Sequence, residues 1–360
     1  MKIALVHEYF CNLGGADTVA RVLHEMFPDA PVYTLLVYER NRNHPWLRGM
    51  ELRPSFIQRL PFAGRTHQPY LPLMPLAIEQ LDLSGYDIIL SSSSFIAKGV
   101  IPPPGVRHFS YTHTRQRVAW DLESEYVNAV PRPLRLFARA YMHWLRVWDV
   151  TAAQRVDYFI ANSRFVAQRL QQLYGRSAVV IPPPVDTDTF TPLDVPRGEQ
   201  YIVVGRLVWY KRFDLAVEAC KQLGRALVII GDGPERAALE KIAGAQTRFM
   251  GEQPHAVIRE QLAQARGLLH PGLEDFGIVP VEAQAMGCLV IAYNAGGVRD
   301  TVRDGETGVL FSDASAQDLM GAMLRAEQLR FKPEVLRENA LRFSTERFKA
   351  QLRDYIFSCL

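Results

Sequence analysis

Short apolar runs alternate with amphipathic segments along this chain, and the alternation starts twice. In the first half, strands are expected at 3–7, 32–36, 87–91, 108–112 and 158–161. After the prolines at 182–184 the pattern begins again, with strands at 200–205, 226–231, 248–251, 267–271 and 289–293, and helices at 213–223, 234–243, 257–265 and 280–286. Such alternation is typical of parallel sheets covered by helices, so the sequence predicts an α/β protein with two doubly wound, Rossmann-like domains.

The length of 360 residues fits two domains that each bury a core of their own. We expect an N-terminal domain over 1–190 and a C-terminal domain over 191–340, with a proline-marked hinge at 182–184 and 191–196. Two such sheets facing each other would leave an interdomain cleft at the carboxyl ends of their strands, which is where sheets of this kind bind ligands.

The composition, with 48% hydrophobic and 22% charged residues, is typical of an ordinary globular protein. A net charge of +3 is too small to indicate a nucleic-acid partner. No apolar run reaches the roughly 18 residues of a membrane-spanning helix. The first residues lack the apolar core of a signal peptide, so we expect a cytoplasmic protein. The four cysteines are scattered and are expected to be reduced.

A basic loop follows the expected strand at 200–205. It begins at Gly205 and contains Arg206 and Lys211 ahead of the helix at 213–223. A guanidinium offers a planar fork to phosphate oxygens, and an ammonium supplies a mobile point charge. The loop is therefore predicted to bind an anion at the carboxyl edge of the sheet; a solvated basic loop is the alternative.

Two glutamates, Glu274 and Glu282, frame the loop after the strand at 267–271. Pro280 suits the first turn of a helix, which would present backbone amides to a phosphate. Those amides belong to Phe276, Gly277, Ile278 and Val279. A carboxylate offers two acceptor oxygens to paired hydroxyls, so Glu274 is predicted to bind a sugar and Glu282 a ribose. Solvated or capping acids, or a glycosidase carboxylate pair, are the alternatives.

The N-terminal half adds a glycine pair and a histidine. Gly14 and Gly15 follow the first strand, where small residues let the backbone approach a phosphate or a sugar. His113 follows the strand at 108–112, where an imidazole can donate or accept a hydrogen bond and can change charge near neutral pH. A plain loop and a structural histidine are the alternatives.

On these residues the chain resembles the retaining family 4 glycosyltransferases of the GT-B fold, over essentially its whole length and most strongly at 200–310. The motifs are the loop at 205–214, the Gly-Asp-Gly-Pro at 231–234, and the Glu-x7-Glu spacing within 274–295. The resemblance implies that Arg206 and Lys211 hold the diphosphate of a sugar nucleotide. It implies that Glu274 contacts the transferred sugar and that Glu282 holds the ribose.

The same resemblance extends to three further parts of the chain. It implies that Met250 lines the base, that His113 is an active-site residue, and that a last helix within 341–360 crosses back to the N-terminal domain. The segment 113–126 is similar to bacterial mannosyltransferases of O-antigen and exopolysaccharide assembly, which use GDP-mannose.

The expected reaction is therefore retaining transfer of a hexose, mannose from GDP-mannose, to a glycan or a polyprenyl-diphosphate-linked acceptor. The expected catalytic residues are His113, Glu274, Arg206 and Lys211. A GT-B-fold phosphorylase or epimerase is one alternative, and a non-catalytic, membrane-associated protein that binds nucleotide sugars is another.

Asp186 and Asp188 form an Asp-x-Asp pattern, which in other glycosyltransferases holds a divalent metal. Here the pattern follows the prolines at 182–184, away from both expected cleft edges. We therefore expect metal-independent transfer without a cofactor, in which cationic side chains and helix amides neutralise the leaving diphosphate.

Residues 131–148 contain four arginines and no acidic residue. Leu134, Phe137, Ala138, Tyr141, Leu145 and Trp148 fall on one face at helical spacing. The first interpretation is a helix that packs this face on the core and exposes a basic face. The alternative is peripheral docking on anionic lipid at the cytoplasmic face of the inner membrane, where a lipid-linked acceptor would lie.

Overall fold

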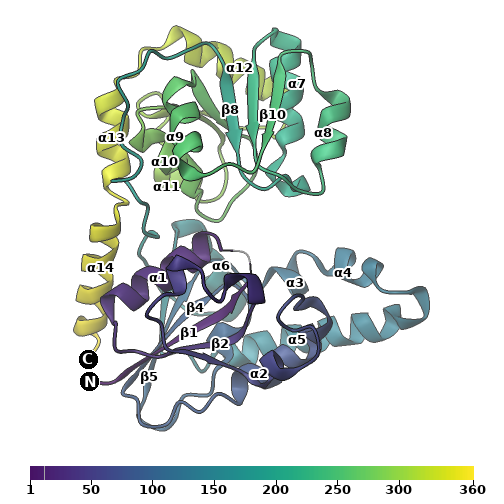
Figure 1. Cartoon of the computed structure of the whole chain (residues 1–360), viewed down its shortest axis with the longest axis vertical. Helices are drawn as coiled ribbons and strands as arrows, with labels where there is room; N and C mark the ends of the chain where they lie inside the picture. The colour runs from purple at the N-terminus through teal and green to yellow at the C-terminus, as the bar shows by residue number, and fades with distance from the viewer. Residues whose placement is uncertain (12) are drawn as a thin grey trace. The chain divides into compact units, whose positions relative to one another are not determined.

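The computed structural model describes residues 1–11 and 13–360, which divide into two compact units. Unit 1 comprises Met1–Pro182 and Lys349–Leu360, and unit 2 comprises Pro183–Phe348. Each unit contains one parallel sheet flanked by helices (Figure 1), which confirms the predicted α/β class. The last helix, α14 (Thr345–Ser358), begins in unit 2, and its residues from Lys349 onward belong to unit 1.

Unit 1 has a seven-stranded sheet in the order β3-β2-β1-β4-β5-β6-β7. Its strands are β1 (Ile3–Phe10), β2 (Val32–Val37), β3 (Leu52–Pro54), β4 (Ile88–Ser93), β5 (Arg107–Thr112), β6 (Tyr158–Ala161) and β7 (Ala178–Val180). Its α-helices are α1 (Gly15–Met26), α2 (Met74–Glu79), α3 (Arg117–Trp120), α4 (Glu123–Ala129), α5 (Arg135–Ala153) and α6 (Arg164–Tyr174), together with the second part of α14. Short 3-10 turns are η1 (Glu39–Asn41), η2 (Pro45–Leu47), η3 (Phe56–Arg59), η4 (Gln68–Leu73), η5 (Ala97–Gly99) and η6 (Arg132–Leu134).

Unit 2 has a six-stranded sheet in the order β10-β9-β8-β11-β12-β13. Its strands are β8 (Tyr201–Val204), β9 (Leu227–Ile230), β10 (Thr247–Gly251), β11 (Gly267–His270), β12 (Leu289–Tyr293) and β13 (Gly308–Phe311). Its helices are α7 (Phe213–Leu223), α8 (Arg236–Ile242), α9 (His255–Gln264), α10 (Ile278–Ala285), α11 (Val298–Thr301), α12 (Ala316–Gln328) and α13 (Pro333–Leu341), with the 3-10 turn η7 (Trp209–Lys211).

Local sequence explains these elements. The central strands β2 and β4 are buried along their whole length, as expected of parallel strands covered on both faces. Helix α6 begins after Ser163, whose hydroxyl accepts a hydrogen bond from the amide of Val166, and it ends at Gly175 in the left-handed conformation. Helix α7 also ends at a left-handed glycine, Gly224.

Three edge strands, β3, β7 and β13, were absent from the sequence prediction. Each has only three or four residues, and β3 is largely exposed, so neither length nor burial pattern marks it. Helix α10 begins at Ile278, two residues before the predicted Pro280. No helix in the described part of the chain is long and apolar enough to cross a membrane.

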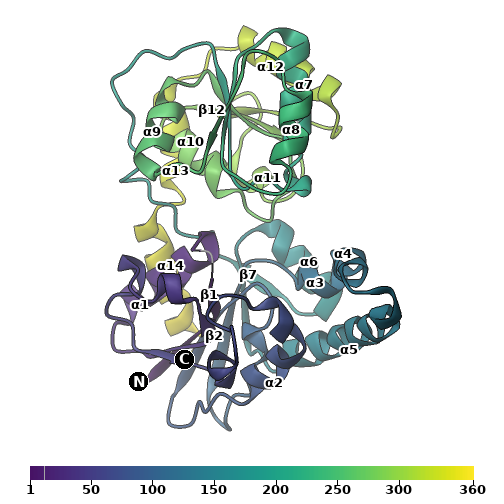
Figure 2. The same cartoon turned by 45° about the vertical axis from the view of Figure 1, so that its right-hand side comes forward.

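The prediction that Leu134 and Phe137 pack on the core is wrong. Their exposed fractions are 50% and 72%. The buried residues of α5 are Met142, Leu145, Trp148, Asp149, Ala152 and Ala153, so its fully buried stretch starts only at Met142. The first half leaves the body of unit 1 beside α4, as both views show (Figures 1 and 2), so it has no sheet to pack against.

Candidate active site

The candidate residues of each unit lie where the strand order reverses. In unit 2 this point is between β8 and β11, which pair directly. The loop with Lys211 follows β8, and the loop with Glu274 follows β11. Ligands of open α/β sheets bind outside the carboxyl ends of strands at such a reversal. The topology therefore brings the predicted basic and acidic loops together at the expected position.

Lys211 and Glu274 form an ion pair, with 2.9 Å between Nζ and Oε1. Their side chains are only 15% and 21% exposed. Burial disfavours the ammonium of Lys211, but the ion pair and hydrogen bond with Glu274 outweigh burial and raise its pKa. The two side chains that the sequence assigned to diphosphate and sugar are thus in contact, and Lys211 is held as a cation.

Two glycines make room for this pair. Gly205 has φ +141°, and a Cβ there would lie 2.5 Å from Nζ of Lys211. Gly296, which follows β12, has φ +73°, and a Cβ there would lie 2.2 Å from the carbonyl oxygen of Glu274. Both positions combine a backbone conformation that favours glycine with a contact that excludes a side chain.

Glu282 lies in the second turn of α10, and its pKa is raised to about 7. Burial is the main cause, and the negative charge of Asp186 adds to it, while the nearby Lys211 opposes both. The segment with Asp186 was expected to lie away from the site. The structure instead places Asp186 close enough to affect the ionisation of Glu282, because the chain enters unit 2 at Pro183, just before that residue.

The N-cap residue of helix α10 is Gly277, which has φ +87°. Gly277 has no side chain that could accept from the first amides of the helix. The first amides of a helix have no acceptor within it, so those of Ile278 and Val279 are suited to an anion. The ring of Phe276 is buried against Phe343, with 5.7 Å between ring centroids, so Phe276 can offer a ligand only its backbone.

The remaining predicted residues of unit 2 are less constrained. Arg206 is exposed and has no ion-pair partner among residues 1–11 and 13–360. Met250 is half-buried at the end of β10, where its carbonyl accepts a hydrogen bond from the side chain of Gln253 at 2.6 Å. Arg206 is free to approach a ligand, whereas Met250 is held at the edge of the sheet.

Sequence reasoning missed His270, the last residue of β11. It is 5% exposed, and its Nε2 has no hydrogen-bond partner in the described structure. Burial and the charge of Lys211 lower its pKa, against the opposing charge of Glu274. A histidine at the end of a strand, four residues before Glu274, was the available signal.

In unit 1 the strand order reverses between β1 and β4, and the glycine pair and His113 lie at the carboxyl ends of these strands and of β5. Gly14 caps α1, and Gly15 is its exposed first residue. His113 is half-buried, and its Nε2 lies 2.8 Å from Oγ of Ser92. Burial, with the nearby His7, lowers the pKa of His113 to about 3. The sequence allowed a change of charge near neutral pH, but a histidine with this pKa is neutral around pH 7, which leaves hydrogen bonding as its way of contacting a ligand.

The segment after His113, which carries the mannosyltransferase resemblance, is held in place by polar contacts within unit 1. Arg115 pairs with Asp121, and the indole of Trp120 donates a hydrogen bond to Asp149 at 2.9 Å. Asp149 is fully buried and also binds Nζ of Lys98 at 2.5 Å. These contacts account for Arg115, Trp120 and Asp121 structurally. Gln116 is 0% exposed, and both polar atoms of its side chain, like the hydroxyl of Thr114, have no hydrogen-bond partner in the described structure.

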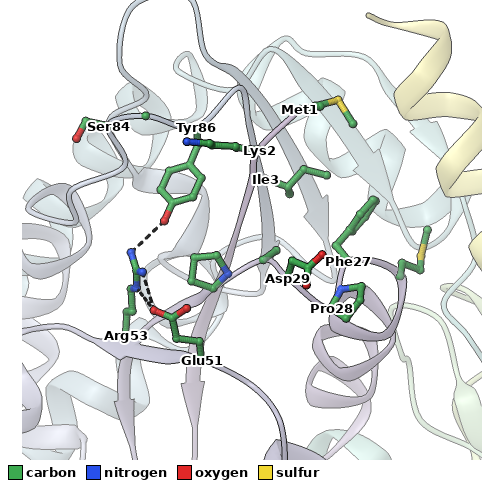
Figure 3. A pocket seen from close by; sticks show the side chains of 14 residues that line it. Met1, Lys2, Ile3, Phe27, Pro28, Asp29, Glu51, Arg53, Ser84 and Tyr86 are labelled. Carbon is green, nitrogen blue, oxygen red and sulfur yellow. Dashed lines mark hydrogen bonds and ion pairs between the residues drawn. The ribbon is translucent and has the colours of Figure 1, made fainter.

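A surface hollow of about 660 Å³ lies elsewhere in unit 1. Figure 3 shows Arg53 bonded to Glu51 and Tyr86 on its wall. Lys2 and Ile3 line the hollow at the start of β1, so it lies at the amino end of the strand, opposite to His113. Within the described residues, no group of three or more histidine, cysteine, aspartate or glutamate side chains is arranged to hold a metal ion.

Both halves of the chain match families of known proteins. The sequence-family model "Glycosyltransferase Family 4" matches residues 13–189, and the family model "Glycosyl transferases group 1" matches residues 188–343. A glycogen synthase of Pseudomonas syringae is 34% identical over 162 residues, which are 42% of this chain and 32% of the relative. The chain thus spans about a third of the length of that relative.

Two solved structures share the fold. Anabaena Alr3699/HepE in complex with UDP has a TM-score of 0.72 at 18% identity, covering 99% of this chain and 100% of that one. The lipopolysaccharide outer core galactosyltransferase WaaB has a TM-score of 0.69 at 18% identity and full coverage of both chains. With two adjoining family models and two parallel-sheet units, the chain belongs to the GT-B glycosyltransferases, with a family 4 amino-terminal half and a group 1 carboxyl-terminal half.

Proposed function

We propose that this protein transfers a hexose from a nucleoside diphosphate to an acceptor hydroxyl with retention of configuration. The observation that supports this most is the contact between Lys211 and Glu274 where the strand order reverses, beside the start of α10. A cation next to the first amides of a helix suits a diphosphate, and an adjacent carboxylate suits sugar hydroxyls.

In the proposed reaction, the bond between the anomeric carbon and the diphosphate oxygen breaks, and a bond to the acceptor oxygen forms on the same face. The acceptor proton passes to the leaving diphosphate. Lys211, Arg206 and the amides at 276–279 stabilise the negative charge that develops there, without a metal ion. Glu274 orients the sugar.

Further residues are assigned to the remaining parts of the donor. Glu282 binds the ribose hydroxyls, Met250 lines the base, and Gly15 allows the backbone of unit 1 to approach the donor. His113 forms a hydrogen bond to the transferred sugar. These assignments follow the family resemblance of each position.

The proposed donor is GDP-mannose, on the basis of the segment 113–126, and the acceptor is a glycan or a polyprenyl-diphosphate-linked glycan of the bacterial surface. UDP-glucose and other hexosyl donors are alternatives to GDP-mannose. The names of similar proteins suggest them, since the HepE structure is a complex with UDP and a glycogen synthase aligns with this chain. A thermal-shift panel of GDP-mannose, GDP, UDP-glucose and UDP separates these donors, because a ligand that binds only the native state stabilises it.

Transfer is tested with radiolabelled GDP-mannose and UDP-glucose on lipid-linked glycan acceptors, in buffer with EDTA. Lys211→Met and Glu274→Gln should each lower kcat by about 100-fold or more, as expected when a charge at a reacting centre is lost, while the circular dichroism spectrum at the assay temperature stays that of the folded wild type. Lys241→Met and Glu260→Gln, which alter exposed residues of α8 and α9, are the matched controls. Normal turnover in either site variant, or no transfer from any donor by the wild type, contradicts the proposal.

The exposed part of the α4–α5 hairpin supports a further part of this proposal, peripheral binding to a membrane. Leu136, Phe137, Trp144 and Val147 are 74%, 72%, 47% and 54% exposed and share one side of α5 at spacings of one, seven and three residues. Large apolar side chains on a surface commonly mark an interaction site.

The charge of residues 131–148 favours an anionic lipid surface. Arg132 and Arg139 are exposed beside the apolar side chains, and residues 131–148 contain no acidic residue. Anionic lipids attract such residues by about 1 kcal/mol each near the surface. Arg135 is less suited to a test, because it binds the carbonyls of Asn128 and Val130 and so holds the turn between α4 and α5.

Flotation with vesicles tests membrane binding. Leu136→Ser with Phe137→Ser should abolish flotation with vesicles that contain phosphatidylglycerol. Arg132→Glu with Arg139→Glu should do the same, and phosphatidylcholine vesicles should bind the wild type weakly. Leu76→Ser, at a 48% exposed leucine elsewhere in unit 1, is the control. Undiminished flotation of both double variants rejects membrane binding through this hairpin.

A further inference from the structure

A chain of hydrogen bonds runs through unit 1 from the glycine loop to His113. Oδ2 of Asp17 accepts from the amide of Gly14 at 2.9 Å, and Oδ1 lies 3.3 Å from Nε2 of His7. Nδ1 of His7 lies 3.2 Å from Oγ of Ser92. The same Oγ lies 2.8 Å from Nε2 of His113. We refer to Asp17, His7 and Ser92 as the relay.

The relay is shielded from water and joins separate elements. Asp17, His7 and Ser92 are 7%, 4% and 1% exposed, and they come from α1, β1 and β4. Buried polar groups of this kind are hydrogen-bonded almost without exception. The backbone of His113 is held as well, since its amide donates to the carbonyl of Ser93 at 2.9 Å and its carbonyl accepts from the side chain of Asn162 at 2.8 Å.

The donor and acceptor capacity of each group fixes the direction of the relay. A carboxylate only accepts, so Nε2 of His7 must carry the hydrogen that faces Asp17. When the imidazole of His7 is neutral, its other nitrogen accepts, and the hydroxyl of Ser92 donates to Nδ1 of His7. The oxygen of Ser92 is left to accept, and Nε2 of His113 must donate to it.

We infer that the relay holds His113 in the tautomer with hydrogen on Nε2, so that its Nδ1 accepts a hydrogen bond from a sugar hydroxyl. Nδ1 of His113 has no hydrogen-bond partner elsewhere in the described chain, and the side chain is half-buried, which leaves this lone pair for a ligand. Asp17, His7 and Ser92 are therefore positioning residues. The role toward sugar rests on the proposed function, whereas the tautomer does not.

The relay also joins two features that the sequence presented separately. The same carboxylate of Asp17 holds the amide of Gly14 and orients His7. A shift of the loop at Gly14 would therefore be transmitted through Asp17 to His113. The glycine pair and the histidine act as one assembly in unit 1.

The test is the tautomer of His113 in the unliganded protein, read from the ring-nitrogen shifts of histidine-labelled protein by NMR at pH 8. His113→Gln assigns the signals by their loss. The wild type should show protonated Nε2 and unprotonated Nδ1. In Asp17→Asn the amide oxygen can still accept from Gly14 while its NH₂ group faces His7. Every bond of the relay then reverses, and Nδ1 of His113 should become protonated.

Activity and a second variant complete the test. Asp17→Asn should lower kcat/KM by roughly 10-fold, the usual size of a lost hydrogen bond in a buried site. Ser92→Ala removes the bridging hydroxyl, so Asp17→Asn should no longer change the tautomer in that background. If Asp17→Asn does not fold, Ser92→Ala alone should turn the single tautomer into a mixture. A wild type with protonated Nδ1, or a tautomer unaffected by both substitutions, overturns the inference. The expected tautomer together with no transfer from any donor overturns the proposed function and leaves the relay intact.

Discussion

The ionised form of Glu282 destabilises the folded protein, and substitution of this residue should remove that destabilisation. Its ordinary pKa is 4.5, and burial followed by the charge of Asp186 raises it to about 7 in the folded protein. One pKa unit corresponds to about 1.36 kcal/mol, so a shift of this size is worth about 3 kcal/mol. Because the folded state binds this proton more tightly, stability is full below the unfolded pKa and is lost as the pH rises through the folded pKa.

The perturbation is Glu282→Gln, which keeps the shape of the side chain and removes its titration. Urea unfolding of wild type and variant is compared at pH 4.5, 6 and 8. Relative to the wild type, the free energy of unfolding of the variant should rise by about 3 kcal/mol from pH 4.5 to pH 8. Glu260→Gln, at an exposed position of α9, should show no such trend. A difference between Glu282→Gln and the wild type that is independent of pH, or that falls with pH, refutes the reasoning.

Three further predictions concern the site and its support. Sugar-nucleotide binding, measured by calorimetry, should be about tenfold weaker at pH 6 than at pH 8, because Glu282 can accept from both ribose hydroxyls only as a carboxylate and its pKa is about 7. Asp149→Ala should lower the free energy of unfolding by about 3–5 kcal/mol, since it leaves the buried ammonium of Lys98 without its partner at 2.5 Å. Gly205→Ala should weaken sugar-nucleotide binding by about tenfold or more, because its Cβ would lie 2.5 Å from Nζ of Lys211 and would displace the cation.

Each of these has its own control. Binding by Glu282→Gln should be independent of pH between 6 and 8, and an equal pH dependence there would assign the effect to another group. Asp149→Ala with Lys98→Met should recover part of the lost stability, and no recovery would mean that the loss comes from packing alone. Gly224→Ala, at a left-handed glycine with open space around its Cβ, should leave sugar-nucleotide affinity intact. A comparable loss of affinity there would show that backbone strain, and not the contact with Lys211, is responsible.

Much of the architecture was accessible from the sequence, because burial and periodicity are local properties. Alternating apolar and amphipathic segments indicated two parallel-sheet domains, and both sheets are present. In a parallel sheet the carboxyl ends of all strands share one edge, so loops that follow strands must gather there. For that reason Lys211 and Glu274 could be assigned to one edge although 62 residues separate them along the chain.

Only the tertiary structure decided which groups touch. Strand order makes β8 and β11 neighbours and so allows Lys211 to reach Glu274, and no pattern within either loop encodes that order. His7 and Ser92 lie 85 residues apart and meet because β1 pairs with β4. The sequence also could not predict that an apolar face of α5 is exposed. Periodicity shows that a helix has an apolar face but not whether a neighbour covers it. Local sequence therefore determined the elements and the edge at which the site lies, and the packing of distant segments determined the burial, the ionisation of Glu282 and the partners of His113.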